Sequence, residues 1–317
     1  MQRAHNQAIG EATGKIILMG EHAVVYGEPS LAIPFPKATI QTTVTPSKGP
    51  VTVECIYHKG LLSTAPERLA NLVTVVDVSL KALKQESKDF SLHITSTIPA
   101  ERGMGSSAAV AVATVRALYN YFEEPLSHDQ LLELVNVSEV IAHGNPSGLD
   151  AAMTSGENPL YYIKGKPFVP FSLSIDAYLV VGDTGVKGQT REAVGSIAAL
   201  MESYPEVTAQ DIHQLGDLAD KAKTAIENNQ PVELGKLMHQ AHLLLAKLGV
   251  SNDQLNQLVD AALEAGALGA KLTGGGRGGC MIALAESEAA ALEIAQALSK
   301  TGTSHTWVYH LGGGSVE

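Results

Sequence analysis

Two glycines and two serines in residues 99–109 combine backbone freedom with hydroxyl groups, as a phosphate-binding loop requires. Gly103 and Gly105 can adopt backbone angles that a Cβ forbids, and Ser106 and Ser107 follow directly. The Ala- and Val-rich residues after them predict a helix, whose first N–H groups and dipole attract an anion. The spacing matches neither a Walker A loop nor a dinucleotide fingerprint. By itself the segment is also compatible with a glycine turn capped by serine.

A second set of polar residues, Lys15, Glu21 and His22, surrounds a short apolar run. Residues 16–19 are short and apolar enough for a buried strand, and Gly20 ends that run. Lys15 therefore begins a strand, and Glu21 and His22 lie in the turn after it. Charged groups beside a buried strand must be paired or reach a cleft. Each residue alone is also compatible with an ordinary strand that has polar ends.

A third set pairs a helix with the loop after it. Residues 127–143 have amphipathic periodicity, with Ser127 and Gln130 spaced as a capping box. Glu139 lies one turn before the predicted helix end, and a loop rich in Gly, Asn, Pro and Ser then leads to Asp150. A carboxylate near a helix C-terminus is unfavourable unless a cation compensates it. Mg²⁺ or a surface lysine could supply that charge, and a plain surface position is the alternative for Glu139.

Taken together, these segments resemble the GHMP kinases. The resemblance rests on residues 14–27, 99–109 and 271–280, which follow one another in the order of the family, and it extends over essentially the whole chain. The sequence departs from the family pattern in three places: Thr13 replaces the usual proline, Met104 stands where leucine is common, and Arg277 interrupts the last glycine run.

The resemblance implies phosphoryl transfer from ATP to an alcohol. Such a reaction needs a phosphate cradle, a divalent metal, a cation and a group that orients the hydroxyl. Asp150 matches the catalytic base and Lys15 the cation beside it, with a buried ion pair as the alternative. Ser107 and Glu139 match the metal-ligand positions of the family. Two protein oxygens are enough because Mg²⁺ keeps several of its waters. The implied nucleotide-binding positions are Pro99, Arg102, Gly103, Met104, Gly105, Ser106, Ser107, Ala108 and Ala109.

The same resemblance places Glu21 and His22 at the substrate, while the polar turn that ends at Thr190 and the glycine run around Gly275 make these two residues further candidates. His22 could donate a hydrogen bond to a carboxylate or a hydroxyl, while either Glu21 or His22 could instead cap the strand turn. Residues 274–279 hold too many glycines for a packed strand, so their backbone must approach a neighbour closely. Thr190 either helps to hold a substrate carboxylate or caps the helix that it begins.

Residues 143–150 resemble the family members that phosphorylate mevalonate. This implies ATP and mevalonate as substrates, and ADP and 5-phosphomevalonate as products. Galactose and homoserine are the alternative acceptors. A decarboxylase with the same fold and a catalytically silent sensor are the alternative functions, although Lys15, Ser107, Glu139 and Asp150 are all present, which argues against a sensor.

The elements that must position these residues alternate between strands and helices. By resemblance the fold is α+β with two domains, a mixed α/β kinase domain over residues 1–180 and a ferredoxin-like domain over 181–317. The active site is expected in the cleft between them. Residues 39–44 and 51–57 predict a β-hairpin. Further strands are predicted at 92–97, 160–163, 178–181 and 305–310, and helices at 66–86, 106–120, 208–228, 231–247, 252–265 and 287–299.

Composition excludes several other classes of protein. With 317 residues and 45% hydrophobic residues the chain can build two cores, and a net charge of −11 argues against nucleic acid or an anionic membrane as partner. No apolar run is long enough to span a bilayer, and the polar start does not resemble a signal peptide. Cys55 and Cys280 lack the spacing of a zinc site and suit a reducing, cytoplasmic location. A homodimer is left open.

Overall fold

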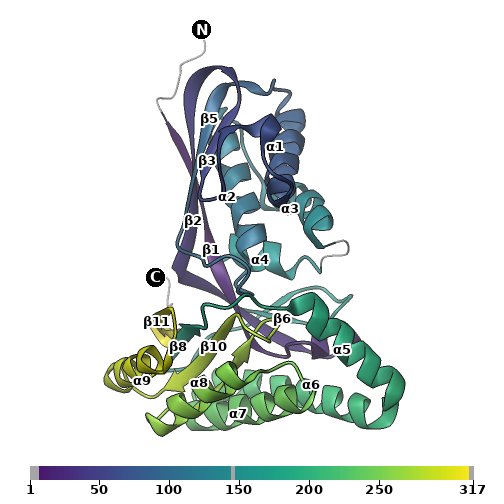
Figure 1. Cartoon of the computed structure of the whole chain (residues 1–317), viewed down its shortest axis with the longest axis vertical. Helices are drawn as coiled ribbons and strands as arrows, with labels where there is room; N and C mark the ends of the chain where they lie inside the picture. Colours follow the sequence, from purple (N-terminus) through teal and green to yellow (C-terminus); the bar gives the residue numbers. More distant parts are fainter. Residues whose placement is uncertain (1–6, 144–146, 314–317) are drawn as a thin grey trace. The chain divides into compact units, whose positions relative to one another are not determined.

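The computed structural model describes residues 7–143 and 147–313 (Figure 1). Its internal contacts define two compact units. Unit 1 consists of Met1–Lys15, Pro34–Ile98 and Gly105–Glu157, and unit 2 consists of Ile16–Ile33, Pro99–Met104 and Asn158–Glu317. The units are therefore interleaved along the sequence. The boundary between a first domain over residues 1–180 and a second over 181–317 stays a prediction.

Unit 1 combines a mixed sheet with a layer of helices. Its strand order is β4-β3-β5-β2, with β1 beside β2. Helices α1, α2 and α3 pack against one another, and α4 packs against α2 and α3 (Figure 1). The strands are β1 (Ala8–Met19), β2 (Ser30–Pro50), β3 (Thr52–Cys55), β4 (His58–Leu61) and β5 (Lys88–Ser96). The end of β1 and the start of β2, within Ile16–Ile33, belong to unit 2. The helices are α1 (Ala70–Leu83), α2 (Ser106–Tyr121), α3 (His128–His143) and α4 (Leu149–Ser155), with the short 3₁₀ turns η2 (Leu62–Thr64) and η3 (Glu67–Leu69).

The predicted hairpin between residues 39–44 and 51–57 is wrong. Strand β5 lies between β2 and β3, antiparallel to β2 and parallel to β3. Strand β3 instead forms its hairpin with β4. Alternating apolar residues show which face of a strand is buried, but they do not specify its partner. A strand much later in the chain therefore takes the place that the local turn residues suggested for β3.

Unit 2 is built around a four-stranded antiparallel sheet. Its order is β11-β8-β10-β9, and in chain order this is 4-1-3-2, which confirms the ferredoxin-like prediction. Helices α7, α8 and α9 pack against the sheet (Figure 1). The strands are β8 (Tyr178–Asp183), β9 (Gly269–Thr273), β10 (Cys280–Ala285) and β11 (His305–His310), and the helices are α5 (Thr190–Ser203), α6 (Pro205–Glu227), α7 (Pro231–Lys247), α8 (Asp253–Glu264), α9 (Glu288–Thr301) and the 3₁₀ turn η4 (Leu311–Gly313).

A smaller part of unit 2 is formed by the chain near its beginning. The first residues of β2 pair with β6 (Leu160–Tyr162), which pairs in turn with β7 (Val169–Pro170). The 3₁₀ turn η1 (Ala23–Tyr26) packs against α6. Within residues 7–143 and 147–313, no helix has both the length and the apolar character that crossing a bilayer requires.

Candidate active site

Lys15 and Asp150 form an ion pair in unit 1. The Lys15 ammonium lies 3.1 Å from Oδ1 of Asp150. Lys15 extends from a buried part of β1 and its side chain is 8% exposed, whereas the Asp150 side chain is 38% exposed. The pair is therefore only partly buried, and solvent reaches the Asp150 carboxylate.

Asp150 lies in the first turn of α4. Gly148, with φ 78°, precedes this helix in the left-handed region, and Asp150 follows two residues later. The partial positive charge at a helix N-terminus attracts a carboxylate, as does the Lys15 ammonium. The motif that predicted this site also includes residues 144–146, which lie outside the described residues.

The N-terminus of α2 adjoins this ion pair. A Cβ at Gly105 would stand 2.9 Å from Cγ of Lys15 and 3.1 Å from Cγ2 of Thr154, so only glycine lets the helix begin here. Gly105 has φ 74°, and among the described residues no side chain caps the N-terminus of α2. The alternative of a serine-capped turn is therefore wrong. Gly105, which begins this helix, therefore lies against the Lys15 side chain.

Besides the two glycines, three more of the predicted nucleotide-binding residues can offer only their backbone. The side chains of Met104, Ala108 and Ala109 are buried in the cores, whereas Ser106 and Ser107 are partly exposed. The buried residues hold the segment in place by packing. The two serines are the ones in this segment of α2 whose hydroxyls can reach a ligand.

Ser107 joins two helices to the start of α2. Its hydroxyl donates to Oε1 of Glu139 at 2.7 Å and accepts from Nδ2 of Asn71 at 3.0 Å. Glu139 is only 3% exposed, which rules out the surface position that its place in the helix suggested. Asn71, in the first turn of α1, was not predicted, because no motif surrounds it in the sequence.

The Ser107–Glu139 pair fits a magnesium ion better than a transition metal. Among residues 7–143 and 147–313, no three His, Cys, Asp or Glu side chains gather as an all-protein metal cage. Mg²⁺ needs only one or two protein oxygens when phosphates and water complete its shell. The hydroxyl and carboxylate oxygens of this pair supply such a partial shell.

Unit 2 holds a second, fully buried ion pair between Glu21 and Lys271. Lys271 comes from β9, and its ammonium also donates to the carbonyl of Leu272 at 2.7 Å. Burial lowers the pKa of Lys271 below its ordinary value, although the Glu21 carboxylate opposes that shift. Sequence reasoning did not single out Lys271. The available signal was a lone lysine inside an otherwise apolar strand.

His22 contacts the glycine-rich loop at residues 274–279. Its Nε2 lies 3.1 Å from the carbonyl oxygen of Gly275, and because a carbonyl only accepts, Nε2 carries the proton. Burial lowers the pKa of His22 to about 4, and the charges of Lys271 and Arg277 act in the same direction. The ring is thus neutral at pH 7, and its Nδ1 is an acceptor. This chemistry matches a substrate hydroxyl rather than a carboxylate.

Gly275 also lies against Thr190. A Cβ at Gly275 would overlap the Thr190 side chain. Thr190 is the first residue of α5, which has no side-chain cap, so the capping interpretation of Thr190 is wrong. The Arg277 guanidinium donates to Oγ of Ser196 at 2.9 Å, and its backbone N–H donates to the carbonyl of Val250 at 2.8 Å. Arg277 therefore fastens the glycine loop to its surroundings.

Pro99, Arg102 and Gly103 belong to unit 2. A Cβ at Gly103 would lie 3.4 Å from Cα of Gly274, so this part of the predicted nucleotide loop runs beside the glycine loop. The Arg102 guanidinium donates to the Asp183 carboxylate at the end of β8. Each unit thus gathers its own group of predicted residues, and an active site in a cleft between domains stays a prediction.

Comparison with known proteins identifies the family. Residues 71–157 match the GHMP kinases N terminal domain, and residues 222–304 match the GHMP kinases C terminal family. A mevalonate kinase of Pyrococcus abyssi is 36% identical over 315 residues, covering 93% of this chain and 92% of that protein. This chain belongs to the GHMP kinase family. As a GHMP kinase it is an ATP-dependent kinase, and its α+β fold is the one that the resemblance implied.

Solved structures of GHMP kinases agree with this assignment. The mevalonate kinase of L. major in complex with R-mevalonate has a TM-score of 0.82 at 25% identity, covering 96% of this chain and 95% of that one. The mevalonate kinase of methicillin-resistant Staphylococcus aureus has a TM-score of 0.74 at 34% identity, covering 98% and 100%. The likeness therefore extends over both units of the chain.

Proposed function

We propose that this GHMP kinase transfers the γ-phosphoryl group of ATP to the C5 hydroxyl of (R)-mevalonate, giving 5-phosphomevalonate and ADP. The relatives named above, all mevalonate kinases, support the choice of substrate. The observation that carries the reaction type is the Lys15–Asp150 ion pair beside the uncapped N-terminus of α2. This arrangement places a carboxylate, a cation and anion-binding N–H groups in one unit.

Asp150 is proposed to orient the acceptor hydroxyl and to accept its proton. Its carboxylate is exposed enough to reach a substrate, and Lys15 holds it in place. In a loose transition state the alcohol needs little activation, so orientation is the larger part of this contribution. The Lys15 ammonium also stabilises negative charge on the transferring phosphoryl group. The N–H groups of α2 hold the neighbouring phosphates.

Ser107 and Glu139 are proposed to hold Mg²⁺, which when bound would neutralise charge on the ATP phosphates. Glu139 sits where its charge would be unfavourable without a cation, because it lies near the C-terminal end of α3. Asn71 holds the Ser107 hydroxyl from the other side. The Ser107–Glu139 hydrogen bond prepares two oxygens for the ion.

Glu139→Gln tests this metal site. The change keeps the shape of the side chain but removes its charge, so the Mg²⁺ concentration for half-maximal activity is expected to rise by about tenfold or more. Mevalonate affinity should stay the same. Titration of the initial rate with Mg²⁺ measures the effect, with Glu133→Gln, on an exposed position of the same helix, as the control. An unchanged titration would assign Glu139 a purely structural role.

The substrate-facing residues are proposed to be Glu21, His22, Thr190 and Gly275. His22 accepts a hydrogen bond from a substrate hydroxyl through Nδ1, while Nε2 stays bound to Gly275. Glu21, paired with Lys271, fixes the turn that presents His22. Thr190 and Gly275 contact each other, because the absence of a Cβ at Gly275 leaves room for the threonine side chain.

His22→Ala is expected to raise the KM for mevalonate about fivefold, since one hydrogen bond between neutral groups contributes about 1 kcal/mol. His22→Asn should have a smaller effect, because its amide oxygen lies near the position of Nδ1. Asparagine also tolerates the left-handed backbone at this residue, where φ is 62°. Steady-state kinetics with each substrate varied measures both values. Equal increases in the KM for ATP would instead indicate a structural role at the turn.

A substrate screen tests the proposed function directly. ADP release is followed with ATP and Mg²⁺ and with mevalonate, phosphomevalonate, galactose or homoserine as acceptor. Turnover with mevalonate, at least a hundredfold above the others, is the expected result. Preference for another acceptor would overturn the substrate assignment, and CO₂ release from diphosphomevalonate would overturn the kinase reaction itself.

A cytoplasmic location is proposed as well. Cys55 and Cys280 are both free thiols, as a reducing compartment favours. The homodimer stays a prediction that sedimentation equilibrium tests.

A further inference from the structure

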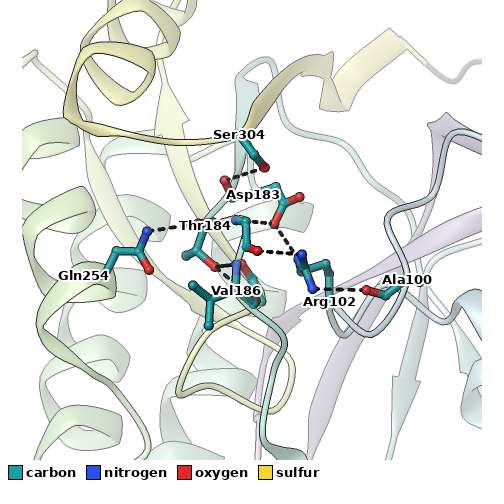
Figure 2. A network of polar contacts seen from close by, with 9 residues as sticks. Ala100, Arg102, Asp183, Thr184, Val186, Gln254 and Ser304 are labelled. Carbon is teal, nitrogen blue, oxygen red and sulfur yellow. Dashed lines mark hydrogen bonds and ion pairs between the residues drawn. The ribbon is translucent and has the colours of Figure 1, made fainter.

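The Arg102 side chain makes three hydrogen bonds within unit 2. Its Nε donates to Oδ1 of Asp183 at 2.9 Å, and its two terminal nitrogens donate to the carbonyls of Gly185, at 2.8 Å, and Ala100, at 3.2 Å (Figure 2). The side chains of Arg102 and Asp183 are 15% and 7% exposed. The guanidinium thus spans from the end of β8 to the segment Pro99–Met104.

Asp183 is itself part of a wider network. Its Oδ1 also accepts from the N–H of Gly185, and its carbonyl accepts from the hydroxyl of Ser304. The next residue, Thr184, donates to the carbonyl of Gly279, and its own carbonyl accepts from Gln254 (Figure 2). The partner of Arg102 is therefore held on several sides. Because Asp183 is held in place, it fixes the position of the Arg102 side chain.

The segment that Arg102 holds has an unfavourable backbone conformation. Glu101 has φ 60° and Gly103 has φ 78°, so the residues on both sides of Arg102 lie in the left-handed region. For a residue with a Cβ this conformation costs free energy and persists only when its surroundings impose it. The hydrogen bonds of Arg102, together with the Gly188 N–H that donates to the Glu101 carbonyl, supply those surroundings.

We propose that Arg102 is a positioning residue, which acts through Asp183 to hold the Pro99–Met104 segment in the conformation that binds nucleotide. This inference rests on the proposed function, in which that segment leads into the phosphate-binding N-terminus of α2. The three nitrogens of the guanidinium already donate to protein acceptors, so this group is not the one that contacts phosphate. Backbone N–H donors bind a phosphate less tightly when their segment is free to move, because binding must then order the segment.

Substitutions at both ends of the pair test the proposal. The probe is a non-hydrolysable ATP analogue with Mg²⁺, and its dissociation constant is measured by calorimetry alongside that of mevalonate. Arg102→Gln and Asp183→Asn should each weaken analogue binding by about tenfold, because each removes one charge from the same ion pair. The double variant should be no weaker than Arg102→Gln. Mevalonate binding should change less than threefold.

Arg102→Lys separates positioning from direct phosphate contact. Lysine keeps the positive charge but lacks the planar fork that reaches three acceptors at once, so it should weaken analogue binding as much as Arg102→Gln. If Arg102→Lys and Asp183→Asn both bind the analogue like the wild type, Arg102 contacts phosphate directly and the proposal is overturned. Equal weakening of mevalonate and analogue, with a lower Tm, would show a merely structural role and overturn it too.

Lys187→Gln provides the matched control. Lys187 pairs with Glu101 on the same segment, but both side chains are more than half exposed, so its loss should change analogue binding less than twofold. If Lys187→Gln weakened analogue binding as much as Arg102→Gln does, Arg102 would not be a distinct positioning residue and the proposal would be overturned. Failure of the wild type to bind the analogue would contradict the proposed function instead.

Discussion

Asp150→Asn is expected to lower kcat by about two orders of magnitude or more, while ATP binding stays nearly intact. Asparagine keeps the size of the side chain but cannot accept the proton of the hydroxyl, and it gives Lys15 an uncharged partner. The loss should fall on kcat because the orienting contact matters most as the phosphoryl group transfers. Steady-state kinetics with both substrates, together with binding of an ATP analogue, measures the two effects.

Asp253→Asn is the matched control for this change. Asp253 also lies in the first turn of a helix, α8, but it is exposed and far from any proposed site residue in sequence. The kcat of the Asp253→Asn variant should equal that of the wild type. If Asp150→Asn also keeps kcat within a few-fold of the wild type, Asp150 does not lie at the reacting hydroxyl, and the Lys15–Asp150 pair is structural.

Lys271→Met is expected to produce the largest loss of stability, about 3–5 kcal/mol in the free energy of unfolding. The Lys271 and Glu21 side chains are 0% and 1% exposed, so removing the cation leaves a carboxylate charge deep in the protein. Methionine fills much of the space of the lysine stem and limits the loss from packing alone. Urea denaturation, with its midpoint and slope, measures the change.

Two further variants separate charge from volume. Combining Glu21→Gln with Lys271→Met removes both charges and should recover part of the lost stability. Lys59→Met breaks the exposed pair with Glu54 on β4 and β3, where the expected change is below about 1 kcal/mol. A single Lys271→Met variant as stable as Lys59→Met would show that the buried pair contributes little.

The sequence could predict the residues whose chemistry depends on local order. Gly105 must precede a helix, and the serines after it must lie in the first turn, because helix geometry is local. Lys15 and Asp150 were assigned together only through the family resemblance, and the structure places them 3.1 Å apart. Their roles stay proposals. The same resemblance predicts a metal-ligand role for Glu139, which stays a proposal, and the burial of Glu139 contradicts the surface position that its place in the helix alone indicated.

Contacts between segments that are distant in the sequence could not be predicted from local sequence patterns. The partner of Glu21 is Lys271, 250 residues later, and nothing near either residue indicates the other. Asn71 reaches Ser107 only because α1 packs beside α2. The wrong hairpin has the same origin, since β5 displaces β3 from β2 without any change in their alternation. Tertiary packing decides among partners that the local sequence leaves equivalent.

Interleaving of the two units has a consequence for how the chain is synthesised. Every segment of unit 1 lies before residue 158, so this unit is complete in sequence while the rest of the chain is still being translated. Ile16–Ile33, by contrast, belongs to unit 2, so it lacks the later part of that unit until Asn158 and the residues after it have been made. Strand β1 can already pair with β2, but the buried run Ile16 to Met19 stays uncovered on the nascent chain until those later residues pack against it. An uncovered apolar run of this kind makes the unfinished chain prone to aggregate.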